Sequence, residues 1–155
     1  MESTLDGVIG MDFFDKLVRF ETALWNSVER ELVREGQVGL GTLMALRVLH
    51  RYDGAGRVHD LSRELALTIG ASSKLVDRLE RDGLATRRPH PTDRRSSLLT
   101  LTASGEDTRA AGEEVLERSL RSILGDDSEL AAAMSAIQEL QARLDGTPRQ
   151  LRHTS

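Results

Sequence analysis

Apolar side chains recur at spacings of three, four and seven residues along the first third of the chain, as on one face of an amphipathic helix. These apolar positions are Phe14, Leu17, Leu24, Trp25, Val28 and Leu32. The pattern predicts a long first helix over residues 11–35, which Gly36 ends. A second helix is predicted from Leu40 to Leu49, and the breaker run 53–56 closes it.

Two shorter amphipathic segments follow, with a glycine-containing turn between them. The third predicted helix spans Val58–Leu67, the fourth spans Ala71–Asp82, and Thr68-Ile69-Gly70 joins them. A turn of this length lets two helices meet steeply, so the pair predicts a helix-turn-helix. Gly83 is expected to cap the fourth helix.

Beyond Gly83 the helical period stops. Residues 84–88 and 97–101 are short and relatively rich in Thr and Leu, and a polar run over residues 89–96 separates them. Two such runs joined by turn-forming residues predict a β-hairpin with a long polar tip. We call this tip, residues 89–96, the wing.

Two further helices complete the pattern. The first begins near Thr102 or Ser104, either of which can cap it, and ends at Gly125; Ser128 is then expected to cap the last helix. This last helix carries apolar residues at nearly heptad spacing, namely Leu130, Met134, Ile137, Leu140 and Leu144. The stripe exceeds what one small lobe can bury and therefore predicts a homodimer, with burial inside the same chain as the alternative.

The predicted fold class is mainly α with a small β-hairpin wing. We expect a single domain over residues 1–148. Its helical dimerisation lobe comprises residues 11–53 and 103–145, and its winged helix-turn-helix lobe comprises residues 54–102. Residues 149–155 have little to bury and are predicted to form a disordered tail.

Composition excludes several classes of function. A chain without cysteine has no disulfide framework and no thiolate metal site. No metal site is expected from histidine either, because His50, His59, His90 and His153 form no close pair at ligand spacing. Neither a Gly-rich phosphate loop nor a Gly-x-Ser-x-Gly elbow is present, so we expect no enzyme and no cofactor. Because neither a signal peptide nor a membrane-length apolar run is found, a cytoplasmic location without membrane contact is expected.

The charges are distributed unevenly. The whole chain has a net charge of -4, which is unusual for a protein that binds nucleic acid, but residues 54–104 hold nine basic and six acidic residues. A basic segment on an acidic body favours a protein with one face toward phosphate.

The fourth helix has the side chains that a reading helix needs. Small polar residues near its N-terminus allow a close approach to base edges in the major groove, and cations further along favour phosphate. The alternative is an ordinary solvated helix face. The predicted contacts of this helix are Ser72, Ser73, Lys74, Asp77 and Arg78, and the supporting phosphate contacts are Arg63, Arg81 and Arg87.

Two arginines at the wing suit the narrow minor groove. Arg94 and Arg95 are long cations on an exposed tip, which lets them enter a groove that excludes the rest of the protein. Asp93 beside them would be unfavourable near phosphate unless it orients an arginine or caps the turn. A surface loop with incidental charge is the alternative.

These segments together resemble the MarR family of winged-helix regulators. The resemblance rests on residues 70–84, on Arg87-Arg88-Pro89 and on residues 99–105, while the family's wing pattern of Asp, any residue, Arg falls on Asp93 and Arg95. It implies a dimer joined through the first helix and the last two, which represses by covering a palindromic promoter site in double-stranded DNA. It also implies release by a small-molecule effector, often aromatic or anionic.

The candidate effector pocket consists of Trp25 on the first helix with His50, Tyr52 and Arg57 near the junction of the lobes. A tryptophan on an apolar helical stripe is more often part of a core, which is the alternative for Trp25. The modest basic excess also permits a different function, a winged helix that binds a protein partner without specific DNA binding.

Overall fold

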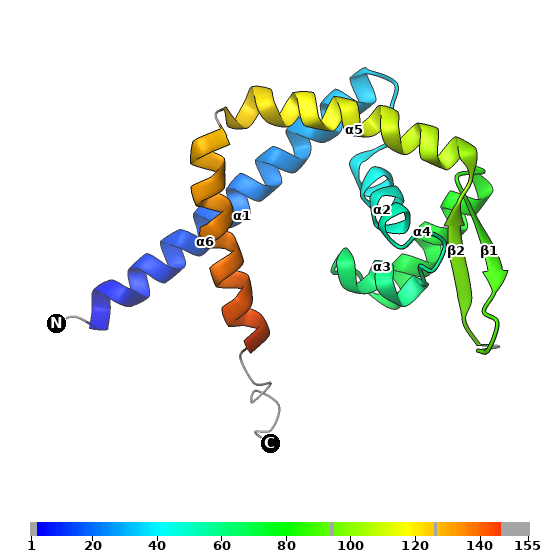
Figure 1. The fold of residues 1–155 in the computed structure, drawn as a ribbon. Helices are drawn as coiled ribbons and strands as arrows, with labels where there is room; N and C mark the ends of the chain where they lie inside the picture. Colours follow the sequence, from blue (N-terminus) through cyan, green and yellow to red (C-terminus); the bar gives the residue numbers. More distant parts are fainter. Residues whose placement is uncertain (1–2, 94, 126, 147–155) are drawn as a thin grey trace. The chain divides into compact units, whose positions relative to one another are not determined.

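The computed structural model describes residues 3–93, 95–125 and 127–146. Arg94 of the wing and the predicted tail at 149–155 lie outside the described residues. The helices are α1 (Ser3–Arg34), α2 (Leu40–Arg51), α3 (Val58–Glu64), α4 (Ile69–Arg81), α5 (Ala103–Leu124) and α6 (Asp127–Gly146), and the strands are β1 (Ala85–Pro89) and β2 (Ser97–Leu101) (Figure 1). The predicted class, mainly helical with a two-stranded hairpin, is confirmed.

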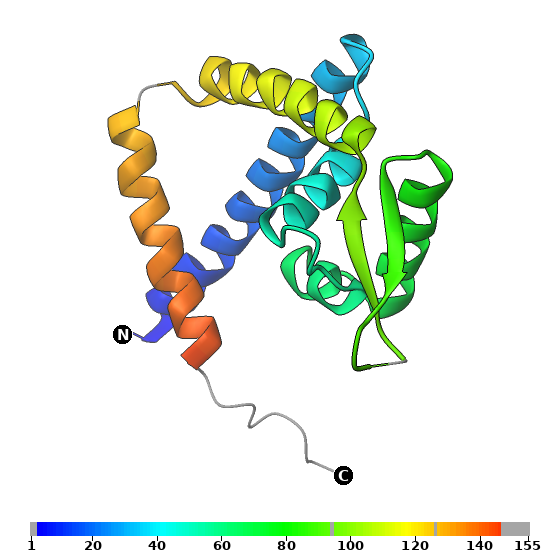
Figure 2. The ribbon, with the colours of Figure 1, turned by 45° about the vertical axis from the view of Figure 1, so that its right-hand side comes forward.

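Two compact units make up the chain, residues 1–117 and 118–155. In the first unit, α2, α3, α4 and the hairpin share one hydrophobic core, and the hairpin lies beside α4 (Figures 1 and 2). Leu46, Leu61, Val76, Leu79 and Leu99 are fully buried in that core. The core contains side chains from every element of the helix-turn-helix and from both strands, so it fixes the hairpin against the helices.

The connection between α3 and α4 differs from the predicted turn. Helix α3 ends at Glu64, residues 65–68 form the turn, and α4 begins at Ile69. The hydroxyl of Thr68 accepts a hydrogen bond from the backbone N–H of Ala71 at 3.1 Å, which makes Thr68 the N-cap. The expected turn at 68–70 is therefore wrong, because Gly70 lies inside the first helical turn and Ala66, with φ of 52°, has the left-handed backbone.

The predicted hairpin is confirmed. The strands pair antiparallel with Ala85 opposite Leu101 and Pro89 opposite Ser97. Gly56, just before α3, adds a backbone bridge to this hairpin, since the N–H of Leu99 donates to its carbonyl at 2.8 Å. The start of α3 is thereby tied to the hairpin as well as to α4.

Helix boundaries show where sequence signals compete. Gly36 and Gly125 end α1 and α5 with φ of +70° and +75°, as expected. Helix α1 begins at Ser3 rather than at residue 11, because the strongest helix breakers before residue 11 are the isolated glycines Gly7 and Gly10, which a helix tolerates. Helix α6 begins at Asp127, so Ser128 lies within it and is not its N-cap.

Thr102 joins the start of α5 to the end of the helix-turn-helix. Its hydroxyl donates to the carbonyl of Gly83 at 2.6 Å and accepts from the N–H of Gly105 at 3.0 Å, which confirms Thr102 as the cap of α5. Its N–H donates to the carbonyl of Leu84 at 3.1 Å. The first turn of α5 consequently rests directly on the backbone of Leu84.

The close approach at this junction requires glycine. A Cβ atom on Gly105 would lie 2.0 Å from the carbonyl oxygen of Leu84, which is backbone and cannot rotate away. We expect Gly105→Ala to lower the free energy of unfolding by at least about 2 kcal/mol, because overpacking against rigid backbone displaces α5. Urea unfolding followed by circular dichroism measures this change.

Gly41→Ala is the matched control, since Gly41 is also helical and has open space where its Cβ would lie. The control should retain or slightly increase stability. Equal stability of the two variants would contradict the tight contact between α5 and Leu84.

Candidate nucleic-acid interface

Helix α4 separates a buried face from a polar one. Leu75, Val76 and Leu79 point into the core, while Lys74 and Arg78 are exposed. Asp77 and Arg81 are exposed beside them, and Ser73 is half-buried. Apart from Ser72, the side chains predicted to face outward on this helix reach its surface.

Ser72 is the exception and corrects the sequence interpretation. Its exposed fraction is 0%, because it precedes Leu75, Val76 and Leu79 by three, four and seven residues and so shares their face. Its hydroxyl has no hydrogen-bond partner among the described residues. Ser72 therefore lies on the buried face of α4 and cannot contact DNA from this position.

The arginines predicted as supporting phosphate contacts are paired with neighbouring acids. Arg87 contacts Asp77 at 2.6 Å and Glu80 at 3.2 Å, which links β1 to α4. Arg63 contacts Asp60 at 3.2 Å, and Arg81 contacts Asp82 at 3.4 Å. Each of these carboxylates offsets part of the positive charge that the arginine would offer to phosphate.

Three other cations differ from this paired set. Lys74 and Arg78 of α4 and Arg95 of the wing have no carboxylate within ion-pair distance in the part of the chain that the structure describes. All three side chains are exposed. Lys74, Arg78 and Arg95 thus carry positive charge without an acidic partner, as do Arg57 and Arg88, whose guanidinium groups contact His90 and the carbonyl of Gly54.

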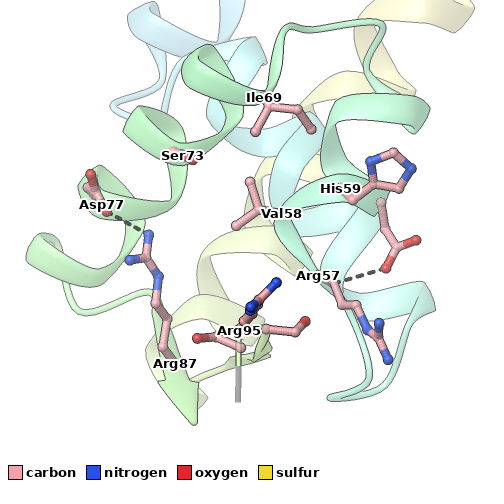
Figure 3. Close-up of a pocket in the computed structure, with 11 residues that line it drawn as sticks. Arg57, Val58, His59, Ile69, Ser73, Asp77, Arg87 and Arg95 are labelled. Carbon is pink, nitrogen blue, oxygen red and sulfur yellow. Dashed lines mark hydrogen bonds and ion pairs between the residues drawn. The ribbon is translucent and has the colours of Figure 1, made fainter. Parts of the chain in front are cut away.

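A depression of about 660 Å³ separates α4 from the wing. Arg57 and His59 line it from the start of α3, Ser73 and Asp77 from α4, and Arg95 from the wing (Figure 3). Val58 and Ile69 contribute apolar surface. Helix, wing and the α3 terminus therefore border one continuous concave surface.

A hydrogen bond within the wing fixes its turn. The carboxylate of Asp93 accepts a hydrogen bond from the N–H of Arg95 at 3.0 Å, so Asp93 caps the turn, as one of its two expected roles required. His90 of the wing is half-buried and contacts the guanidinium of Arg57 at 2.7 Å. Sequence reasoning missed this contact because 33 residues separate its partners.

The four residues predicted to line an effector pocket lie in separate surroundings. Trp25 is 42% exposed on α1 and lines a shallow hollow with Glu21, Thr22 and Asn26. Arg57 lines the depression beside the wing instead. Trp25 and Arg57 therefore line different hollows of the single chain, and Trp25 is not a core residue of its own unit.

His50 and Tyr52 point to different partners because two residues turn a helix by roughly 200°. His50 contacts Glu106 of α5 at 2.9 Å, and this hydrogen bond is the main cause that lowers the pKa of Glu106. The hydroxyl of Tyr52 donates to Glu64 at 3.2 Å and accepts from Arg63 at 2.7 Å. These contacts tie α2 to α5 on one side and to α3 on the other.

Other kinds of site find no support among the described residues. No group of three or more His, Asp or Glu side chains there could hold a metal ion. No helix within the described ranges is long and apolar enough to cross a membrane.

Comparisons with known proteins find sequence similarity over part of the chain and a similar fold over most of it. The sequence model of the MarR family matches residues 38–96. The HTH-type transcriptional regulator BilQ of Clostridium symbiosum is 35% identical over 82 residues, which is 50% of this chain and 53% of that protein. The chain spans little more than half the length of the curated relatives it matches.

Solved structures show the same fold at low identity. The transcriptional regulator BldR of Sulfolobus solfataricus superposes with a TM-score of 0.78 at 17% identity, covering 86% of this chain and 95% of that one. A mutant MarR of E. coli complexed with operator DNA gives a TM-score of 0.72 at 18% identity, covering 81% and 91%. These likenesses extend over all but a minor part of the chain and establish the winged-helix fold.

Proposed function

We propose that the protein is a transcriptional regulator of the MarR family, whose sequence model matches residues 38–96, and that it binds a specific site in duplex DNA through α4 and the wing. The observation that carries this proposal is the placement of charge. Lys74, Arg78 and Arg95 are exposed and unpaired by carboxylates among the described residues, whereas Arg63, Arg81 and Arg87 are paired.

Helix α4 has the surface that the major groove accepts. Its buried face is held by the core, so Ser73, Lys74, Asp77 and Arg78 project together on one side. A carboxylate can accept from the amino group of cytosine, and lysine or arginine can contact guanine or phosphate. Two structurally similar proteins are recorded with DNA, the E. coli MarR mutant with operator DNA and CouR with a 23-mer duplex.

The wing supports a second contact. Asp93 caps the turn that carries Arg95, and the adjacent depression separates this side chain from α4. Such a spacing lets a helix occupy the major groove while the arginine enters the neighbouring minor groove. Arg94, predicted for the same role, is part of this proposal on sequence grounds alone.

Removal of the unpaired cations should weaken DNA binding. We expect Lys74→Ala, Arg78→Ala and Arg95→Ala each to lower affinity roughly tenfold and to reduce the slope of log K against log salt by about one, because each loses one phosphate or base contact. The measurement is fluorescence anisotropy with a duplex obtained by selection from random sequences, repeated at several salt concentrations.

Arg30→Ala is the control, since Arg30 is an exposed arginine of α1 whose guanidinium contacts Ser27. This variant should bind as the unmodified protein does. Failure of the protein to bind any duplex at low salt, with capture of a protein partner instead, would favour the alternative of a protein-interaction module.

The proposal includes a homodimer formed through the terminal helices. Helix α1 exposes an apolar series, and α6 exposes Met134, Ile137, Leu140 and Leu144. The series on α1 is Ile9, Met11, Phe13, Phe14, Leu17, Val18, Phe20 and Trp25. Exposed apolar surface of this extent marks an interaction site, and a second copy of the chain places two reading helices on a palindromic site about 34–36 Å apart.

A charge on this surface should prevent association. We expect Phe14→Glu to shift the protein from dimer to monomer and to weaken DNA binding, because Phe14 is 63% exposed within one chain and would be buried in the dimer. Sedimentation equilibrium measures the change. Lys16→Ala, on the same helix, is the control, and an unchanged mass for Phe14→Glu would argue against α1 in the interface.

Repression and release by a small-molecule effector complete the proposal, and both derive from the family resemblance. A ligand can shift the equilibrium between DNA-competent and incompetent forms only by its difference in affinity for them. A tenfold difference therefore weakens DNA binding by at most about tenfold.

The effector hypothesis has a direct test. In a metabolite screen we expect at least one aromatic or anionic compound to lower DNA affinity and to raise the melting temperature of the free protein. Compounds that do one without the other would not meet this expectation, and a screen without a compound that does both would refute effector control.

A further inference from the structure

The ring of His90 contacts the backbone of the turn at the base of the wing, as an Asn or Asp side chain does in many turns. Its Nδ1 atom accepts from the backbone N–H of Thr92 at 3.3 Å and of Asp93 at 3.1 Å. Asn and Asp side chains commonly close turns by accepting such bonds from amides two or three residues ahead. The His90 ring therefore folds the chain over Pro91 and directs the rest of the wing.

The other ring nitrogen attaches the wing to the helix-turn-helix. Nε2 of His90 lies 2.7 Å from Nη2 of Arg57, the N-cap residue of α3. Arg57 is itself fixed, because its backbone N–H donates to the carboxylate of Asp60 at 3.0 Å. Two segments far apart in sequence thus meet through one side-chain contact beside the depression that α4 borders.

The backbone amides of Thr92 and Asp93 and the guanidinium of Arg57 can only donate to the ring, whereas the hydroxyl of Thr92, 3.4 Å from Nδ1, can donate or accept. A backbone amide and a guanidinium have N–H groups and no acceptor, so each requires a lone pair from the ring. A neutral imidazole offers one lone pair, either at Nδ1 for the turn or at Nε2 for Arg57. A protonated imidazole offers none and adds a second positive charge beside Arg57. Protonation therefore removes whichever contact the neutral ring makes.

We propose that His90 and Arg57 are positioning residues of the wing, which hold Arg95 in its DNA-binding place only while the ring of His90 is neutral. This inference rests on the proposed DNA-binding function. Neither residue needs to touch DNA: the neutral ring either sets the turn through Nδ1 or joins the wing through Nε2 to Arg57 at the start of α3.

The charged side chains around the ring of His90 are directed to other partners or are cationic. Arg57 faces it from α3, and Asp60 lies next to Arg57. Within the wing, Asp93 directs its carboxylate to the N–H of Arg95, and in β1 Arg88 directs its guanidinium to the carbonyl of Gly54 at 3.1 Å. Among the described residues, no carboxylate contacts the ring of His90.

The consequence is an unusual sign for the pH dependence. A histidine that gains charge near DNA ordinarily strengthens binding as the pH falls, since it adds a cation near phosphate. Loss of the His90 contact, which frees the wing, has the opposite effect and weakens DNA binding as the pH falls. We expect affinity to fall roughly three- to tenfold between pH 8 and pH 5.5, the change that loss of one or two hydrogen bonds produces.

Two substitutions test the proposal with the full-length protein. In His90→Asn the amide oxygen replaces Nδ1 as acceptor for the turn and does not titrate, so binding should be nearly constant from pH 8 to pH 5.5. His59→Asn is the matched control, because His59 is an exposed histidine that lines the same depression. The control should lose affinity with falling pH as the unmodified protein does.

A measurement without DNA separates this inference from the proposed function. In ¹H–¹⁵N spectra of the free protein, the amide signals of Thr92 and Asp93 should move together as the pH is lowered from 8 to 5.5, and Arg57→Gln should perturb the same signals. Absence of duplex binding at every pH would refute the proposed function, and these spectra would then decide the inference alone.

Several results would overturn the proposal. One is a pH profile of His90→Asn equal to that of the unmodified protein. A second is affinity of the unmodified protein that is constant or rises as the pH falls. A third is a titration of His90 during which the amides of Thr92 and Asp93 stay unchanged, and this spectrum also decides the case if His90→Asn fails to fold.

Discussion

Burial of one face of α4 is the constraint on which the other features of this protein depend. Leu75, Val76 and Leu79 fill the core that α2, α3 and the hairpin share, and this fixes the rotation of the helix about its axis. The outward direction of Lys74 and Arg78 follows from that rotation. So does the loss of Ser72 from the surface, because the helical period assigns it to the buried side.

Ion pairs distinguish two sets of cations on this surface, those paired with acids and those without an acidic partner. Arg87 is held by Asp77 and Glu80 and so joins β1 to α4, while Lys74, Arg78 and Arg95 retain their charge for a partner. A segment with a small basic excess can thus present a cationic face on an acidic chain, because the acids neutralise arginines such as Arg87 rather than Lys74, Arg78 and Arg95.

Much of the fold could be predicted because its signals are local. Gly36 and Gly125 ended helices as expected, Thr102 capped α5, and the change of period after Gly83 identified the hairpin. The errors arose where two local signals competed. At the turn before α4, the glycine at position 70 suggested a break, but the hydroxyl of Thr68 caps the helix before that glycine.

The sequence by itself determined the order of the elements, the hairpin and the polar face of α4, since periodicity and capping act over a few residues. Only the tertiary structure decided which side chains meet across long separations. It separated Trp25 from Arg57, paired Arg87 with Asp77, and brought Arg57 to His90. Such contacts depend on how whole elements pack, and packing responds to buried shape and volume that no short stretch of sequence specifies.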